Sequence, residues 1–283
     1  MNIKNVMVIG AGQMGNGIAQ VFAQAGYKVK LNDIKKEFVE NGLQKIKDGL
    51  NRQVKKDRMT QEEVNQLLDR ITPSTHYEDV KDIDLVVEAA TENEEIKLNI
   101  FKELDKQAPK HTILASNTSS LSITKIAGAT KRPSKVIGLH FFNPVPVMPL
   151  IELNIALTTS DETIKIMETV GKTLNKKVVN VKDSPGFAVN RILVPMINEA
   201  IFVVDAGIAT IEEVDEAMKL GANQPMGPLQ LADFIGLDTV LAIMQTLYEG
   251  FGDTKYRPAP LLIQYVQAGL FGRKTGQGFY EYN

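Results

Sequence analysis

Short apolar runs alternate with helical patterns over the first two thirds of the chain. The run "NVMVIG" ends at glycines, as a buried parallel strand does. In the next segment Ile18, Phe22 and Ala25 are spaced almost as on one helix face, and the pattern stops at Gly26. Further strand-like runs are "YKVKLND", "DLVVEAA", "TILASN", "KVIGLHF" and "KKVVNV". Strands that alternate with helices predict a doubly wound α/β sheet of the Rossmann type.

A pair of helices is predicted between the second and third of these runs. The first helix has an apolar stripe at Phe38, Leu43, Ile46, Leu50 and Val54. Thr60 and Glu63 have the spacing of a capping box, which opens a second helix. The sequence therefore predicts a helical hairpin inserted in the α/β domain.

The pattern changes at "DSPGF", where proline and glycine indicate a joint, and everything beyond it is predicted to be helical. The expected helices are residues 189–205 with a kink at Pro195, one capped by Thr210 and Glu213, and segments after Pro228 and Pro258. We predict two domains, an α/β domain over residues 1–184 and an all-α domain over residues 185–283.

Composition excludes several classes of protein. A net charge of −2 gives no general affinity for nucleic acid or acidic membranes. The 283 residues include no cysteine, which excludes disulfides, thiolate metal sites and a cysteine nucleophile, and no metal site is predicted. Apolar runs such as "AIFVVDAGIA" are too short to span a bilayer, and "MNIKNVMVIGAG" lacks the features of a signal peptide. We expect a soluble, cytoplasmic protein.

A G-x-G-x-x-G pattern lies between the first strand and the first helix, at Gly10, Gly12 and Gly15. The first glycine permits a tight turn, the second lets a pyrophosphate approach the backbone, and the third permits close helix–strand packing. The helix N-terminus supplies N–H groups and a positive dipole end. The turn, with Gln13 and Met14 inside it, is predicted to bind a dinucleotide.

The second strand ends at Asp33, eighteen residues after Gly15. An acid there accepts hydrogen bonds from the adenine ribose hydroxyls and repels a 2′-phosphate, which favours NAD. Lys35 and Lys36 follow closely and would tolerate a phosphate, so NADP stays open.

A dinucleotide implies hydride transfer, and oxidation of an alcohol also needs a base for the hydroxyl proton. His76 lies in a polar stretch and is expected to face solvent, whereas His111 directly precedes a strand. His140 ends the strand "KVIGLHF", at the sheet edge where ligands bind. Glu152 can fold back on a following short strand to bond the ring. On pattern alone, a catalytic base and a hydrogen-bonded core histidine remain equal alternatives for His140.

Three further stretches surround these candidates: "SNTSSLSIT" (116–124), "GLHFFNPVPVMPLIEL" (138–153) and "DSPGFAVNRILVPMINEA" (183–200). Together with "GAGQMG" they closely resemble the L-3-hydroxyacyl-CoA dehydrogenase family, and the resemblance extends to the terminal "GRKTGQGFYEY". It implies interconversion of (S)-3-hydroxyacyl-CoA and 3-ketoacyl-CoA with NAD(H), with short acyl chains such as 3-hydroxybutyryl. It also implies a homodimer and an acyl-CoA substrate.

The resemblance makes His140 the general base and Glu152 its partner. It places Ser119 and Asn190 beside the substrate, where the hydroxyl would bond the substrate oxygen and the amide would reach across the joint. The alternatives are that Ser119 is a helix-capping residue and that Asn190 caps its own helix.

The resemblance also implies cofactor contacts at Glu92, Lys97 and Asn117. Glu92 and Lys97 would alternatively be a solvated helix start. Arg52 and Lys56, one helical turn apart in "NRQVKKDRM", are the candidates for the phosphates of CoA, against a merely solvated face.

Two other functions stay open at this point. A β-hydroxyacid dehydrogenase of the 6-phosphogluconate type shares the glycine turn and the helical domain, but it relies on a lysine where "SPGFAVNRI" has Asn190. A non-catalytic cofactor-binding protein on the same fold would need no base, and the presence of His140, Glu152, Ser119 and Asn190 disfavours it.

Overall fold

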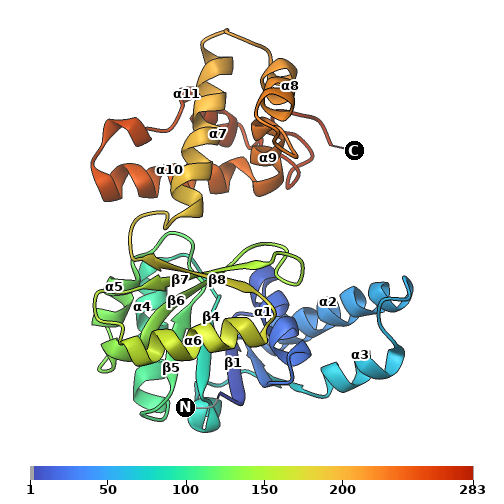
Figure 1. The fold of residues 1–283 in the computed structure, drawn as a ribbon, viewed down its shortest axis with the longest axis vertical. Coiled ribbons are helices and arrows are strands. Elements are labelled where there is room, and N and C mark those ends of the chain that lie inside the picture. Colours follow the sequence, from blue (N-terminus) through green and yellow to red (C-terminus); the bar gives the residue numbers. More distant parts are fainter. Residues whose placement is uncertain (1–2, 283) are drawn as a thin grey trace. The chain divides into compact units, whose positions relative to one another are not determined.

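The computed structural model describes residues 3–282, and the chain divides into two compact units, Met1–Asp183 and Ser184–Asn283. The predicted boundary near residue 184 lies within one residue of this division. Within the described residues of the first unit, eight strands form one sheet in the order β3-β2-β1-β4-β5-β6-β7-β8 (Figure 1). The strands are β1 (Asn5–Ile9), β2 (Lys28–Asn32), β3 (Ile71–Ser74), β4 (Leu85–Glu88), β5 (Ile113–Ser116), β6 (Val136–Phe141), β7 (Leu150–Ile155) and β8 (Lys177–Lys182).

Strands β1 to β6 are parallel, which confirms the predicted Rossmann-type sheet. Strand β7 runs antiparallel to β6, and β8 is parallel to β7. The helices of this unit are α1 (Gln13–Gln24), α2 (Lys36–Val54), α3 (Gln61–Leu68), α4 (Glu94–Gln107), α5 (Ile123–Gly128) and α6 (Asp161–Thr173), with short 3₁₀ segments η1 (Tyr77–Asp82) and η2 (Pro133–Lys135).

Helices α2 and α3 project from the sheet as the predicted hairpin (Figure 1). The capping box of Thr60 and Glu63 opens α3 as expected. The predicted stripe on α2 is wrong at one position, because Phe38 is 41% exposed and Val39 is buried instead. The helix turns this face inward at Gly42, where a Cβ would lie 2.8 Å from the carbonyl oxygen of Ala11.

Strand β3 and helix α6 are among the elements that were not predicted from the sequence. Strand β3 is four residues long and contains Pro73, which a strand tolerates at the edge of a sheet, where β3 lies. Helix α6 begins at the cap Ser160, whose side chain accepts the N–H of Thr163. Its buried residues Met167 and Val170 belong to the core of the sheet.

The two faces of the sheet have different chemistry near its carboxyl edge. Leu139, Phe141 and Leu153 belong to the hydrophobic core with α1 and α6. Successive side chains of a strand point to opposite faces, so His140 and Glu152 lie on the other face. Helix α5 packs on this second face, which we call the α5 face.

The second unit is entirely helical within the described residues up to a short C-terminal turn segment, which confirms the predicted all-α domain. Its elements are α7 (Val189–Asp205), α8 (Ile211–Gly221), α9 (Pro228–Ile235), α10 (Leu237–Phe251), η3 (Thr254–Tyr256) and α11 (Pro260–Gln267). Asp233 fixes the C-terminal segment, because its carboxylate accepts the N–H groups of Phe279 and Tyr280 and the hydroxyl of Tyr282. Among residues 3–282, no single helix is long and apolar enough to cross a membrane; α9 and α10 meet the criterion only as a pair bent by 97°.

Candidate active site

The glycine turn after β1 has the geometry that a pyrophosphate requires. Gly10 has a φ of +96°, and a Cβ there would lie 2.6 Å from Ala90 Cα, while one on Gly15 would lie 1.7 Å from the Gly10 oxygen. A Cβ on Gly12 would meet nothing within 4 Å, so the backbone here is open to a ligand. Helix α1 begins at Gly12 without a side-chain cap, which leaves its first N–H groups to an anion.

Asp33 lies directly beside this turn. Its Oδ2 accepts the N–H of Ala11 at 2.7 Å and its Oδ1 that of Ile34 at 2.7 Å. Each oxygen keeps a lone pair for a ribose hydroxyl. Of the two lysines that follow, Lys35 lies over the ring of Phe38, and Lys36 pairs with Glu40 while 82% of its side chain stays exposed.

The loop between β6 and β7 is held from two sides. Gln13 donates its side-chain amide to Asn143 Oδ1 at 3.2 Å, so this residue of the turn contacts the loop. Lys176 donates to the carbonyls of Val145 and Met148 at 2.8 and 2.7 Å, and burial lowers the pKa of its ammonium. Met14, by contrast, is partly buried and packs against the core.

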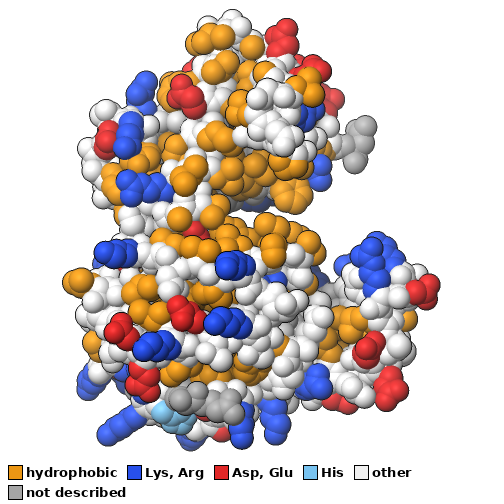
Figure 2. Space-filling view, in the orientation of Figure 1, with side chains coloured by type: hydrophobic (Ala, Val, Ile, Leu, Met, Phe, Trp, Pro, Cys, Tyr) orange, Lys and Arg blue, Asp and Glu red, His pale blue; other side chains and the backbone are white. Residues whose placement is uncertain are grey.

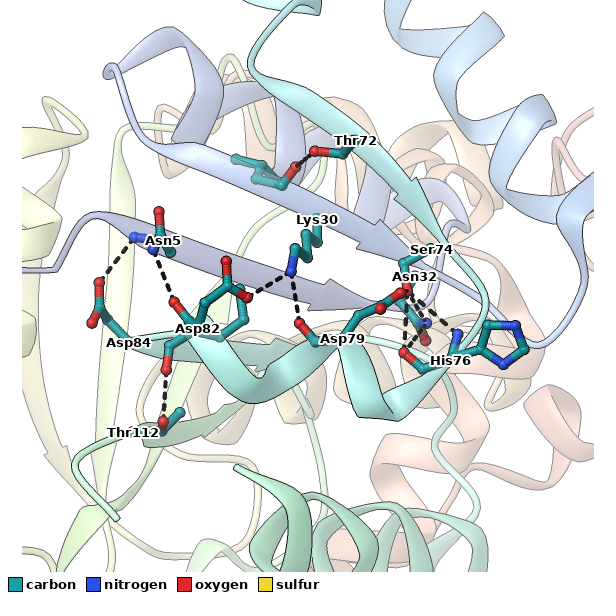
Figure 3. A network of polar contacts seen from close by, with 12 residues as sticks. Asn5, Lys30, Asn32, Thr72, Ser74, His76, Asp79, Asp82, Asp84 and Thr112 are labelled. Atoms are coloured by element: carbon teal, nitrogen blue, oxygen red, sulfur yellow. Dashed lines mark hydrogen bonds and ion pairs between the residues drawn. The ribbon is translucent and has the colours of Figure 1, made fainter. Parts of the chain in front are cut away.

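Two of the three histidines lie away from His140. His76 is exposed, and its ring points away from the polar network that joins Asn32, Ser74 and Asp79 (Figure 3). His111 pairs with Asp84 at 3.3 Å, at the amino ends of β4 and β5. Both positions agree with the sequence predictions.

His140 and Glu152 are register partners on the antiparallel strands β6 and β7. His140 Nδ1 lies 2.9 Å from Glu152 Oε2, and the two residues are 6% and 1% exposed. The ring of Phe142 lies 4.5 Å from the imidazole, centroid to centroid. A carboxylate at Nδ1 stabilises the tautomer with the proton on Nδ1, so Nε2 is the basic nitrogen. The predicted contact is confirmed.

The segment after β5 joins several predicted residues. Asn117 Oδ1 accepts the N–H of Phe141 at 2.9 Å, which fixes the residue after His140. Ser119 donates its N–H and its hydroxyl to Glu92 Oε1 at 2.7 and 3.1 Å. The cap of α5 is Ser122, so the alternative role of Ser119 as a helix cap is wrong.

Asn190 belongs to the second unit. Helix α7 begins after Ala188, whose side chain makes no cap hydrogen bond. Asn190 is the second residue of the helix, so it is not the N-cap of α7 that the structural alternative required.

Lys97 is not at a solvated helix start. Asn93 caps α4, and Lys97 is buried, with 1% of it exposed and its ammonium paired with Glu88 and bonded to Ser116. Glu88 and Ser116 were not among the sequence candidates. Their signal was a polar residue at the end of each of two apolar strands, "LVVE" and "ILAS".

The tip of the α2–α3 hairpin is cationic, and Figure 2 shows lysine and arginine side chains gathered there. Arg52, Lys55 and Lys56 are all exposed. A pocket of about 500 Å³ is lined by Asp48, Asn51, Arg52, Val54, Lys55 and Gln61. Of the two predicted phosphate contacts, Arg52 lines this pocket and Lys56 does not.

Within residues 3–282 no group of three or more histidine, aspartate or glutamate side chains is arranged to hold a metal ion. What the carboxyl edge of the sheet offers is a dinucleotide turn with a paired histidine near it. This combination is typical of dehydrogenases that move a hydride to or from a nicotinamide cofactor and need an acid–base group for the accompanying proton.

The comparisons with known proteins define the family. The model of the 3-hydroxyacyl-CoA dehydrogenase NAD binding domain matches residues 5–184, and that of the C-terminal domain matches residues 186–282. The chain therefore belongs to the 3-hydroxyacyl-CoA dehydrogenase family and is an enzyme of that family. This membership argues against the 6-phosphogluconate-type alternative.

Relatives resemble the chain over nearly its full length. A probable 3-hydroxybutyryl-CoA dehydrogenase of Bacillus subtilis is 53% identical over 282 residues, 100% of this chain and 98% of the relative. The 3-hydroxybutyryl-CoA dehydrogenase of Bradyrhizobium diazoefficiens is 52% identical over 99% of this chain and 96% of its own. The crystal structure of (S)-3-hydroxybutyryl-CoA dehydrogenase from Ralstonia eutropha matches with a TM-score of 0.97 and 52% identity, covering 100% of both chains.

Proposed function

We propose that the protein interconverts (S)-3-hydroxybutyryl-CoA and acetoacetyl-CoA with NAD(H). The observation that carries the proposal is the buried His140–Glu152 pair at the carboxyl edge of a dinucleotide-binding sheet. The names of the full-length relatives support the short acyl chain.

NAD(H), when bound, supplies the hydride acceptor or donor. On oxidation, Nε2 of His140 takes the proton of the substrate C3 hydroxyl, and in the reverse direction the imidazolium returns it. Glu152 stabilises the imidazolium and keeps the ring oriented. Burial of both side chains strengthens this ionic contact by keeping water away.

Ser119 and Asn190 position the substrate in this proposal. The hydroxyl of Ser119, which donates to Glu92 Oε1 at 3.1 Å in the structure, turns to donate to the substrate C3 oxygen in this proposal. Asn190, on the second unit, bonds the C3 oxygen or the thioester through its amide.

The cofactor contacts follow the glycine turn. The backbone from Gly10 to Gly15 holds the pyrophosphate, and Asp33 bonds the adenine ribose. Glu92 and Asn117 contact the nicotinamide end of the cofactor in this proposal. We propose a preference for NAD over NADP because Asp33 repels a 2′-phosphate.

The cationic hairpin tip is the proposed contact for the phosphates of CoA. Arg52 has the stronger position of the two predicted residues, since it lines the pocket. Arg52→Ala should raise KM for the CoA substrate several-fold and leave kcat nearly unchanged, because a remote phosphate contact contributes binding equally in ground and transition states. An unchanged KM in both Arg52→Ala and Lys56→Ala would remove the hairpin from the substrate site.

Three further properties are proposed from the family resemblance: a homodimer, a cytoplasmic location and a role in short-chain acyl-CoA metabolism, in fatty-acid or butyrate pathways. The dimer is tested by the mass of the purified protein in solution, measured by light scattering.

The activity is tested by NADH consumption with acetoacetyl-CoA, comparing native protein with His140→Ala at equal cofactor saturation. We expect rapid native turnover that nearly disappears in His140→Ala, with NADH binding retained. Equal turnover by both proteins would discard His140 as the base, and no native turnover with either NADH or NADPH would overturn the proposed substrate.

A further inference from the structure

A buried ion pair lies under the carboxyl edge, and its lysine, Lys97, is a residue for which the family resemblance implies a cofactor contact. Glu88 ends β4 and Ser116 ends β5, and the two are register partners. Lys97 extends from α4 to reach both side chains. Glu88 and Ser116 are 0% exposed and Lys97 is 1% exposed.

The hydrogen bonds of Glu88, Ser116 and Lys97 reach two backbone segments, one at Ala90 and one at Thr118. Glu88 Oε1 accepts the N–H of Ala90 at 2.9 Å, and its Oε2 accepts the Ser116 hydroxyl at 3.0 Å and the Lys97 ammonium. Ser116 Oγ accepts from Lys97 at 3.3 Å and from the N–H of Thr118 at 3.3 Å. One donor and two acceptor positions of the hydroxyl are therefore all occupied.

The first of these segments leads to the glycine turn. The backbone at Ala90, held by Glu88, is the surface against which Gly10 packs, since a Cβ on Gly10 would lie 2.6 Å from Ala90 Cα. The position of the phosphate-binding turn thus depends on a segment that the ion pair anchors.

The second of these segments leads to Ser119. The Thr118 hydroxyl donates to Glu92 Oε2 at 2.6 Å and accepts the N–H groups of Ser120 and Leu121 at 3.3 and 3.0 Å. The other oxygen of Glu92 accepts both groups of Ser119. The backbone amides of residues 118–121 are therefore all bonded to side chains of one network that begins at Lys97 and Glu88.

We expect the charge of the pair to contribute little to folding, because desolvation of two buried ions offsets most of their attraction. What an ion pair adds is a fixed geometry, here for the hydroxyl of Ser116 and the segment behind it.

We infer that Glu88 and Lys97 are positioning residues for the dehydrogenase reaction, acting through Ser116 and Thr118 on the placement of Ser119. The inference rests on the function proposed above, in which Ser119 bonds the substrate oxygen. In this inference Lys97 affects the rate of the reaction by holding Ser116 in place, and not by contacting the cofactor.

The test is a double variant, Glu88→Gln with Lys97→Met, which leaves no unpaired buried charge. The glutamine keeps an oxygen for the N–H of Ala90 and an amide for Ser116. We expect the variant to fold and to bind NADH with little change in Kd, while kcat with acetoacetyl-CoA falls about 10- to 100-fold from misplacement of Ser119. A large rise in the Kd for NADH at nearly native kcat would overturn the inference, because that is the result of a direct cofactor contact.

A matched control is available on the same helix. Arg132 pairs with Asp105 near the C-terminal end of α4, with 12% and 7% of the side chains exposed. Asp105→Asn with Arg132→Met removes this pair together with the Arg132 hydrogen bonds to the carbonyls of Asp105, Ala108 and Pro109, so it should lower thermal stability and leave kcat at the native value. An equal loss of kcat in both double variants would mean that the effect is one of general stability.

Hydrogen exchange gives a readout that is independent of activity. The amides of residues 118–121 should exchange faster in Glu88→Gln/Lys97→Met than in the native protein, and Thr118→Val should have the same effect on Ser120 and Leu121. In the double variant, Thr118→Val should reduce kcat by less than it does alone, because both changes act on one network. Native exchange rates at 118–121 would overturn the inference even if acetoacetyl-CoA proved to be the wrong substrate.

Discussion

At the scale of single residues, the proposed function depends on which nitrogen of His140 is contacted by Glu152. The Glu152 carboxylate contacts Nδ1 of His140, so the proposed proton transfer takes place at Nε2. A glutamate at position 154 of β7, two residues after Glu152, would instead be paired with Gly138, which has no side chain to contact. The register of β6 and β7 therefore decides that this pair can work as an acid–base group.

Glu152→Gln should lower kcat by about 10²- to 10⁴-fold, because an amide cannot stabilise the imidazolium and favours the other tautomer. The Kd for NADH should remain native. Stopped-flow turnover and fluorescence titration measure the two quantities separately. Loss of NADH binding in parallel with turnover would show that Glu152 supports the fold of the edge and not the base.

Tyr282 gives a pH-dependent prediction. Burial and the neighbouring Asp233 raise the pKa of its hydroxyl to about 12 from the ordinary value of 10.0. A raised folded-state pKa means that the contribution to stability is complete below pH 10 and is lost as the pH rises toward 12. Tyr282→Phe should therefore be less stable than native by about 1 kcal/mol at pH 7, the value of one hydrogen bond, and this difference should shrink as the pH rises above 10.

Chemical denaturation at several pH values measures this difference. Tyr248→Phe, in the same unit, is the control for removing a hydroxyl that is partly exposed, and it should leave stability unchanged throughout. A difference for Tyr282→Phe that stays constant from pH 7 to 12 would contradict the assignment.

At the scale of elements, short helix α5 is fixed by a residue far along the chain. Asp183, the last residue of the first unit, accepts the Ser122 hydroxyl at 2.8 Å and the N–H groups of Ile123 and Thr124 at 3.1 and 2.8 Å. The side chain of Ile123 in turn packs next to Gly138 on the α5 face. The carboxylate thus holds in place the helix that covers this face of the sheet.

Asp183→Ala should lower the free energy of unfolding by about 1–2 kcal/mol, since it removes the partners of two N–H groups at a helix start. Urea denaturation measures the loss. Asp161→Ala is the matched control, because Asp161 opens α6 after the separate cap Ser160 and is expected to contribute only a few tenths of a kcal/mol. Equal losses in the two variants would contradict the role of Asp183.

At the scale of the whole molecule, each unit has its own apolar core. The buried side chains of the sheet form one cluster and those of the helical unit another. The glycine turn and Asp33 belong to the first unit. A ligand bound there stabilises the unit that holds its contacts.

Calorimetry should therefore resolve two transitions, of which NADH raises the one that belongs to the first unit. At about 100 times the Kd, the added stability is about 2.7 kcal/mol. His140→Ala should keep this shift, and Asp33→Ala should reduce it. A single calorimetric transition whose midpoint temperature is raised as a whole by NADH would show that the two units unfold together.

Local patterns determined most of the elements. Apolar runs of four to six residues, capping boxes and glycine positions act between neighbours in the chain, so the strands, the hairpin and the helical unit could be predicted from them. Strand β3 was missed because four residues with a proline carry little local signal, and only its place at the sheet edge makes it a strand. Phe38 was misjudged because the inward face of α2 is chosen by Gly42 against Ala11.

The sequence by itself predicted the residues for which we propose chemical roles: the glycine turn, Asp33, His140 with Glu152, and the segment around Ser119. Tertiary structure alone decided the partners of Lys97, Glu88 and Ser116. Glu88 and Ser116 meet because β4 and β5 are paired in this register, and Lys97 reaches them because α4 packs over the two strand ends. Neither the register nor the packing of α4 can be predicted from the spacing of residues along the chain. A buried charge takes whichever partner the fold brings to it, so its role follows from packing.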